Sequence, residues 1–209
     1  MYLSVFGENT AEQIIERSRF IAYVSHIEGE EEAKAFLARV RAEHPLATHV
    51  CYGYIADGLG NEQRFSDAGE PQGTAGMPIL GVLKAQGLFQ TAVAVVRYFG
   101  GIKLGAGGLT RAYSSSAALG ISAAKICEHD VCVPLRIKVG YPSVNAIMQF
   151  LEREGYSDYG KSFGEEAEFE VAVREKDCTA FCDSIRDRLN GRVVISEGER
   201  YIHPFQINK

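Results

Sequence analysis

Residues 95–113 read VVRYFGGIKLGAGGLTRAY, and this stretch carries most of what the sequence says about the fold. It begins inside a nearly continuous apolar run, residues 91–98, which is typical of a strand buried on both faces. Small residues dominate after the glycines, so we expect a helix over residues 109–127. The pattern predicts a buried strand, a glycine-rich turn and a helix that packs closely. Five glycines form the turn: Gly100, Gly101, Gly105, Gly107 and Gly108.

The glycine-rich turn has features of an anion site. If the helix starts near residues 107–109, its free N–H groups and the positive end of its dipole point into the turn. Three cations, Arg97, Lys103 and Arg111, lie within fifteen residues, and arginine holds phosphate with two parallel hydrogen bonds. The spacing matches neither the G-x-x-x-x-G-K-[ST] loop nor the G-x-G-x-x-G loop. Tight packing of the helix on the sheet is the alternative explanation of the glycines, and both stay open.

A second informative segment precedes this stretch. Residues 57–73 are turn-rich and predict a long loop, and loops of that length in a compact domain are usually functional or disordered. A helix over residues 74–86 should follow, with Thr74 as a possible cap. Polar side chains in such loops usually bond their own backbone. The candidate binding residues of the loop are Arg64, Ser66, Asp67, Glu70 and Thr74.

The loop and the glycine-rich turn together suggest one shared site. Asp67 and Glu70 can lie across from Arg97 and Arg111, where they either hold the turn or frame a ligand. If Arg97 faces the ligand, Arg97→Ala weakens binding and changes stability little. If it is instead a structural ion-pair partner, the substitution lowers stability and leaves binding unchanged.

The remaining pattern predicts an α+β protein of two domains, residues 1–130 and 131–209. In the first domain we expect further strands over residues 19–27 and 48–56 and a helix over 30–43. The second domain reads as strand, helix, strand, strand, helix, strand, which is the βαββαβ order of ferredoxin-like folds. The predicted elements cover residues 131–139, 143–154, 156–163, 166–174, 177–189 and 192–202.

Composition restricts the function classes. The net charge is −5, so the chain is no polycation, and nucleic acid would have to bind a local basic patch. Five cysteines without a C-x-x-C pair argue against a zinc site or a disulfide framework and fit a reducing cytosol. The sequence shows no secretory signal and no apolar stretch long enough to span a bilayer. We therefore expect a cytoplasmic protein without metal, cofactor or membrane partner.

Two blocks of the sequence carry a family resemblance. FSDAGEPQGTAG, residues 65–76, and the stretch at 95–113 resemble the signature blocks of the IMPACT family, bacterial branch. Similarity extends to Arg17-Ser18-Arg19-Phe20 and to RAEHPLATHVCYGY, residues 41–54, and so covers essentially the whole chain. The resemblance implies a first domain like domain 2 of ribosomal protein S5. It implies a ferredoxin-like second domain similar to those near the end of elongation factor G.

The resemblance also implies a link to translation. Eukaryotic relatives restrain an amino-acid-starvation kinase by competing for its activator, but that partner does not carry over to a bacterial-type chain. For bacterial members, nucleic-acid or ribosome binding is suggested mainly by the fold, which is an analogy. RNA, the ribosome or a translation-related protein are the partners that the resemblance favours.

Three function classes remain in view. The first is a binding protein for RNA, the ribosome or a translation factor, acting through Arg97, Lys103 and Arg111; the second domain is a poorer RNA platform, because one face of residues 166–173 is acidic. The second is an enzyme acting on a phosphorylated small molecule, for which the sequence offers no identifiable catalytic partner residues. The third is a protein-interaction module, which exposure of Phe99 and Ile102 would favour. A binding role is preferred over an enzyme.

Overall fold

The computed structural model describes residues 1–156 and 159–207 of the chain. The structure divides into two compact units. The first holds Met1–His129 together with the C-terminal segment that starts at Pro204, and the second holds Asp130–His203. The boundary falls inside strand β7 (Lys125–Val139), and each unit is described by itself.

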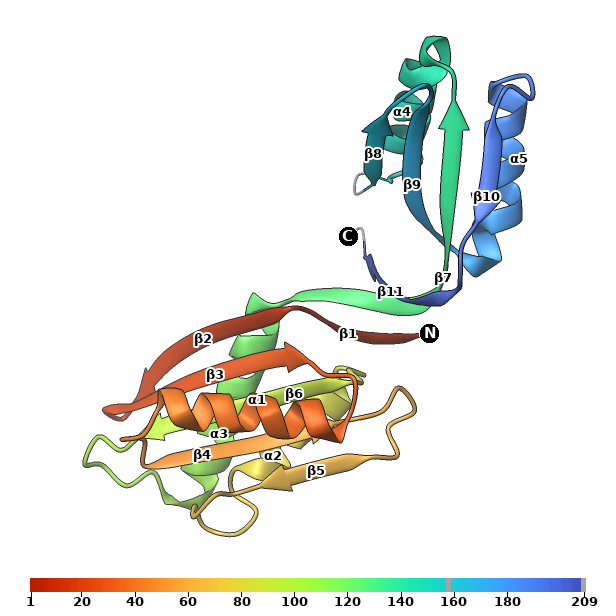
Figure 1. Ribbon diagram of the computed structural model, residues 1–209. Helices are drawn as coiled ribbons and strands as arrows, with labels where there is room; N and C mark the ends of the chain where they lie inside the picture. The colour runs from red at the N-terminus through yellow and green to blue at the C-terminus, as the bar shows by residue number, and fades with distance from the viewer. Residues whose placement is uncertain (157–158, 208–209) are drawn as a thin grey trace. The chain divides into compact units, whose positions relative to one another are not determined.

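A five-stranded antiparallel sheet forms the centre of the first unit, with strand order β2-β3-β6-β4-β5. Helix α1 (Glu30–Glu43) covers one face, and helices α2 (Gly76–Ala85) and α3 (Gly105–Ala123) cover the other (Figure 1). The strands are β2 (Glu8–Ile15), β3 (Ser18–His26), β4 (His49–Ile55), β5 (Gln63–Ser66) and β6 (Thr91–Tyr98).

Strand β6 is buried on both faces, as its apolar run predicts. Ala94 and Val96 pack in the cluster under α1. Val93 and Val95 alternate with them and pack in the cluster under α2 and α3. Side chains alternate along a strand, so Arg97 continues the row of Val93 and Val95 and enters the same core.

The second unit contains the strands and helices of a smaller α+β arrangement. Within its sheet β7 pairs with β9 and β10, and β8 pairs with β9, all antiparallel. The chain order is β7, α4 (Val144–Arg153), β8 (Gly160–Phe163), β9 (Ala167–Arg174), α5 (Cys178–Arg188), β10 (Val194–Glu197) and β11 (Tyr201–Gln206), with short 3-10 helices at Tyr141–Ser143 and Glu175–Asp177. With two antiparallel sheets and their helices, the protein is an α+β structure, as the sequence indicates.

Several predicted boundaries are wrong. Helix α3 starts at Gly105 and ends at Ala123, so the expected helix over 109–127 is displaced toward the N-terminus. Strand β7 begins at Lys125, because its first residues pair with β1 (Tyr2–Phe6), a strand that the sequence pattern misses. Strands β2 and β5 are missed as well, and both lie at the edges of their sheet.

Two strands of the second unit also differ from their predictions. The strand expected over 156–163 is seen as β8, and residues 157–158 lie outside the described residues. The single strand expected over 192–202 is instead two strands, β10 and β11. Within the described residues, 1–156 and 159–207, no helix is both long and apolar enough to cross a membrane. Within the same ranges no group of three or more His, Cys, Asp or Glu side chains is arranged to hold a metal ion.

Candidate functional site

A buried polar network connects the two informative segments of the sequence. The Arg97 side chain is only 6% exposed and donates a hydrogen bond from Nη1 to Glu70 Oε1 at 2.6 Å. Glu70 is 4% exposed at its side chain, and the same Oε1 accepts the Tyr113 hydroxyl at 2.8 Å. Strand β6, the loop before α2 and helix α3 are thereby held by one carboxylate, which is the arrangement that the shared-site hypothesis proposed for Glu70 and Arg97.

Ser18 extends this network to the start of the glycine-rich turn. Its Oγ accepts hydrogen bonds from Arg97 Nη2 at 3.3 Å and from the Gly100 backbone N–H at 3.2 Å. Thr48 Oγ1 accepts the N–H of Phe99 at 3.0 Å. The first residues after β6 are therefore fixed by side chains from β3 and from the segment before β4.

Asp67 organises the loop that leads into α2. One carboxylate oxygen accepts the N–H groups of Ala75 and Gly76 at 2.9 Å each, and the other accepts the Gly73 N–H at 2.8 Å. Burial raises the pKa of Asp67, but the three backbone hydrogen bonds outweigh it and hold the pKa below its ordinary value. Asp67 thus supplies the helix with an N-terminal carboxylate, a position that favours negative charge.

Thr74 and Ser66 bond locally. Thr74 is buried, and its hydroxyl donates to the Pro71 carbonyl at 2.7 Å. The helix cap is Ala75, without a side-chain bond of its own, so the expectation of Thr74 as the cap is wrong. Ser66 Oγ accepts the N–H of Ala68 at 3.2 Å, the local bonding that is usual in loops.

Each glycine of the turn has its own surroundings. A Cβ on Gly100 would overlap the backbone of Arg17, so close approach requires glycine there. Gly101 has φ +89° and open space around it. Gly105, with φ +70°, is the first residue of α3, and Gly107 and Gly108 lie within the first turn of that helix rather than before it. The glycines therefore permit both tight packing and a left-handed backbone.

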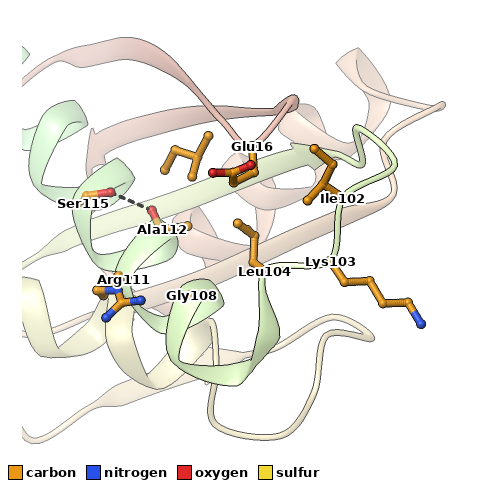
Figure 2. A pocket seen from close by; sticks show the side chains of 9 residues that line it. Glu16, Ile102, Lys103, Leu104, Gly108, Arg111, Ala112 and Ser115 are labelled. Carbon is orange, nitrogen blue, oxygen red and sulfur yellow. Dashed lines mark hydrogen bonds between the residues drawn. The ribbon is translucent and has the colours of Figure 1, made fainter.

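The other cations of the candidate site face solvent. Lys103, Arg111 and Arg64 are all exposed. Among residues 1–156 and 159–207, neither Lys103 nor Arg111 takes part in a salt bridge. Both line a pocket of about 500 Å³ at the start of α3 (Figure 2). Arg64 lies on edge strand β5 and donates to the carbonyl of Gln63.

One wall of the pocket is formed by a segment that the sequence pattern does not identify as part of the site. Ile15 and Glu16 line it from the β2–β3 hairpin. Figure 2 shows Glu16 opposite residues of the glycine-rich turn and of α3. Glu16 and Arg17 form the two-residue loop of this hairpin, since Ile15 pairs with Ser18. Their φ angles are +45° and +63°, in the left-handed region that favours glycine and asparagine. Arg17 and Ser18 belong to the segment Arg17-Ser18-Arg19-Phe20, which the family resemblance includes. That resemblance was the available sequence signal for this wall of the pocket.

Comparison with known proteins now decides the family. The Impact N-terminal domain family matches residues 16–121. An IMPACT family member of Bacillus subtilis, YvyE, is 37% identical over 198 residues, covering 95% of this chain and 91% of the relative.

The chain belongs to the IMPACT family.

Other comparisons agree with this assignment. An IMPACT family member of Haemophilus influenzae is 36% identical over 191 residues, covering 88% of this chain and 90% of the relative. Among solved structures, the crystal structure of a hypothetical protein is 30% identical with a TM-score of 0.60, covering 95% of this chain and 97% of that chain.

The IMPACT signature blocks divide into inward and outward residues. Ser18, Glu70, Arg97 and Tyr113 point inward and connect the blocks, so much of the signature serves the structure. The expectation that Arg97 faces a ligand is replaced by the structural alternative, because the side chain is buried and paired. Lys103, in contrast, leaves the turn toward solvent (Figure 2).

The buried Cys51 thiol of β4 shows no sign of catalytic activation. Burial raises the pKa of Cys51 to about 12, so the thiol stays protonated at neutral pH, and its Sγ lies 2.9 Å from the Asp67 carbonyl oxygen. His49 Nδ1 lies 2.9 Å from the Ala68 carbonyl oxygen, and its Nε2 lies 3.9 Å from Glu70 Oε2, so the ring bridges the loop and the buried network. The site's accessible chemistry is therefore that of the two exposed cations, the pocket and Glu16.

Proposed function

We propose that this IMPACT family protein has a translation-linked regulatory role in the cytosol and binds RNA at the pocket beside the glycine-rich turn. The observation that carries the proposal is the state of the cations there. Arg97 is committed to Glu70, whereas Lys103 and Arg111 are exposed at one pocket and form no salt bridge within the described parts of the chain. Exposed cations without internal partners are what a phosphate backbone recognises.

The sheet face of the second unit that carries Arg136 and Lys138 offers less to a phosphate backbone. Arg136 lies 2.8 Å from both Glu168 and Glu170, and Lys138 lies 3.3 Å from Glu168. These cations already face carboxylates across the sheet, and an RNA phosphate would have to displace them. This comparison supports placing RNA at the pocket of the first unit rather than on that sheet face, although the chain as a whole is acidic.

An enzyme acting on a phosphorylated small molecule is the first alternative. Such an enzyme would use the same anion pocket, but Asp67 and Glu70, the two carboxylates of the loop before α2, are engaged. Asp67 accepts three backbone N–H groups, and Glu70 accepts Arg97 and Tyr113. Neither is poised to take a proton from a substrate, so the binding proposal is favoured.

A protein-interaction module is the second alternative. Phe99 is 46% exposed, and Ile102 is half-buried beside it in sequence. An aromatic side chain at this exposure next to cations is a feature that protein partners use. The same Phe99 ring can stack on an RNA base, so the feature supports either partner.

The finer fold and domain assignments are also part of the proposal. We assign residues 1–130 to an S5 domain 2-like fold and residues 131–209 to a ferredoxin-like fold similar to those of elongation factor G. For the second unit, the support is the chain order β7-α4-β8-β9-α5-β10 together with the sheet order β10-β7-β9-β8. For the first unit, the support is the family itself.

Fluorescence anisotropy with labelled single-stranded RNA tests the binding proposal. Titrations run from about 50 to about 200 mM salt. They compare the wild type with the Lys103→Ala/Arg111→Ala variant and with a Lys34→Ala/Lys84→Ala variant, which removes the same charge from exposed positions on α1 and α2. We expect the first variant to bind at least about 10-fold more weakly. Its log–log salt slope should fall by roughly 1.4, because each lost single-strand phosphate contact removes about 0.7.

The control variant should retain the salt slope of the wild type. Equal weakening of both variants would mean that only bulk charge matters and would remove the site from the proposal. A wild type that fails to bind RNA or ribosomes at low salt would sink the RNA proposal and favour a protein partner.

A further inference from the structure

The pocket beside α3 is large enough to hold a small molecule. Its volume of about 500 Å³ lies within the usual range for small-molecule sites. Part of its lining is apolar, and Ile15 and Leu104 also pack on the hydrophobic core of the first unit. Figure 2 shows Leu104 and Ile102 around the same hollow. An apolar wall anchored in this way suits a flat ring such as a nucleobase.

Glu16 and Arg111 line the pocket with opposite charges, while the Lys103 side chain extends from its rim toward solvent (Figure 2). Glu16, Lys103 and Arg111 form no salt bridge among themselves, so each Glu16 oxygen stays more than 4.0 Å from either cation's nitrogens. A ligand that satisfies both Glu16 and Arg111 must offer hydrogen-bond donors to a carboxylate and an anionic group to a cation. The carboxylate accepts hydrogen bonds only, and the cations donate only.

Glu16 is kept at the pocket by a hairpin loop of unusual composition. Two-residue loops with positive φ at both positions favour Asn-Gly, whereas this loop holds Glu16 and Arg17 at φ +45° and +63°. The backbone of Arg17 packs against Gly100, which fixes the loop relative to the glycine-rich turn. A strained residue whose surroundings fix it in place is an indication of function when a pocket lies next to it.

We propose that this pocket binds a guanine nucleotide, with Glu16 accepting hydrogen bonds from the base and Arg111 contacting its phosphate. Of the four RNA bases, guanine is the one whose Watson–Crick edge offers two adjacent donors, N1–H and the N2 amino group, and a carboxylate accepts both in parallel. The proposal deepens the RNA-binding function and rests on the same site. The guanine can come from single-stranded RNA or from a free nucleotide.

Calorimetric titration with GMP, AMP and IMP tests the base contact, because IMP keeps N1–H and lacks the N2 amino group. We expect GMP to bind about 10-fold or more tightly than AMP, with IMP in between, since a bidentate pair discriminates on that order. Glu16→Gln should abolish the preference. Glu16→Asn should abolish it as well while easing the strained loop, so its loss of binding cannot be attributed to misfolding. Glu12→Gln, on strand β2 of the same hairpin but away from the pocket lining, should behave as the wild type.

Matched single-stranded RNAs with guanine or adenine at one position separate the two sources. Guanine preference in both RNA and mononucleotides supports both proposals. RNA binding without guanine preference overturns the guanine assignment and leaves the RNA proposal standing. A preference for GMP without RNA binding supports the guanine assignment and overturns the RNA proposal. Equal affinities for all three mononucleotides, or an unchanged preference in Glu16→Asn, would overturn the assignment of Glu16.

Discussion

Replacing Arg97 should destabilise the first unit strongly. Arg97→Met leaves the Glu70 carboxylate buried at 4% side-chain exposure, with the Tyr113 hydroxyl as its remaining close donor. Breaking a buried ion pair by removing one partner costs about 3–5 kcal/mol. The lost bond to Ser18 adds to this cost rather than reducing it. We therefore expect the free energy of unfolding of the first unit to fall by about 3–5 kcal/mol.

Hydrogen exchange at the amides of β6 is the appropriate assay, because the chain has two compact units and a global unfolding curve can merge them. Glu70→Gln supplies the decisive comparison. In the wild-type background, Glu70→Gln should lower the free energy of unfolding, because Arg97 loses its anionic partner. In the Arg97→Met background, Glu70→Gln should raise the free energy of unfolding. The substitution removes the unpaired buried charge, and the glutamine still accepts a hydrogen bond from the Tyr113 hydroxyl. A loss below about 1 kcal/mol in Arg97→Met, or a further loss on adding Glu70→Gln, would refute the buried-pair account.

Three further predictions concern the surroundings of the site. The folded-state pKa of Asp67 is lowered, so its contribution to stability is present above the unfolded pKa of about 3.9 and is lost as pH falls through the folded value; unfolding free energies measured from neutral to acid pH should show a steeper acid loss in the wild type than in Asp67→Asn. Gly100→Ala should lower the melting temperature more than Gly101→Ala, because only the first places a Cβ inside the Arg17 backbone, and equal losses would contradict this packing. Cys51, with its pKa raised to about 12 by burial, should react with a thiol reagent at pH 8 only as fast as the protein opens, and rapid labelling under native conditions would contradict its burial.

Local pattern was sufficient for the elements with strong periodicity. The helix at residues 30–43 and the strand at 91–98 coincide with α1 and β6, since four buried side chains mark the inner face of the helix and the strand is buried on both faces. Edge strand β2 escaped prediction because polar residues, among them the consecutive Glu12 and Gln13, leave it without an alternating apolar pattern. Strand β1 was missed, and β7 was predicted to start too late, because their pairing joins residues more than a hundred positions apart.

For the candidate site as well, features of local sequence pattern could be predicted, and contacts made by tertiary packing could not. The segments around Asp67 and Arg97 could be connected from sequence because each concentrates polar residues beside a buried element. The direction of Arg97 was also available, since it shares the strand parity of Val95. The position of Glu16 at the pocket could not be predicted, because only the hairpin geometry brings this residue to the start of α3. Tyr113 was not recognised as a donor to Glu70, since that contact joins residues 43 apart through tertiary packing.

Hydrogen–deuterium exchange of the intact chain, with and without single-stranded RNA, tests the central claim most directly. The account predicts slower exchange on RNA binding at two segments only, the loop between β2 and β3 around Glu16 and the stretch from Phe99 to Arg111. The same segments should lose this protection in Lys103→Ala/Arg111→Ala. Protection that falls instead on the sheet of the second unit, around Arg136, or on α1 would contradict the proposed site.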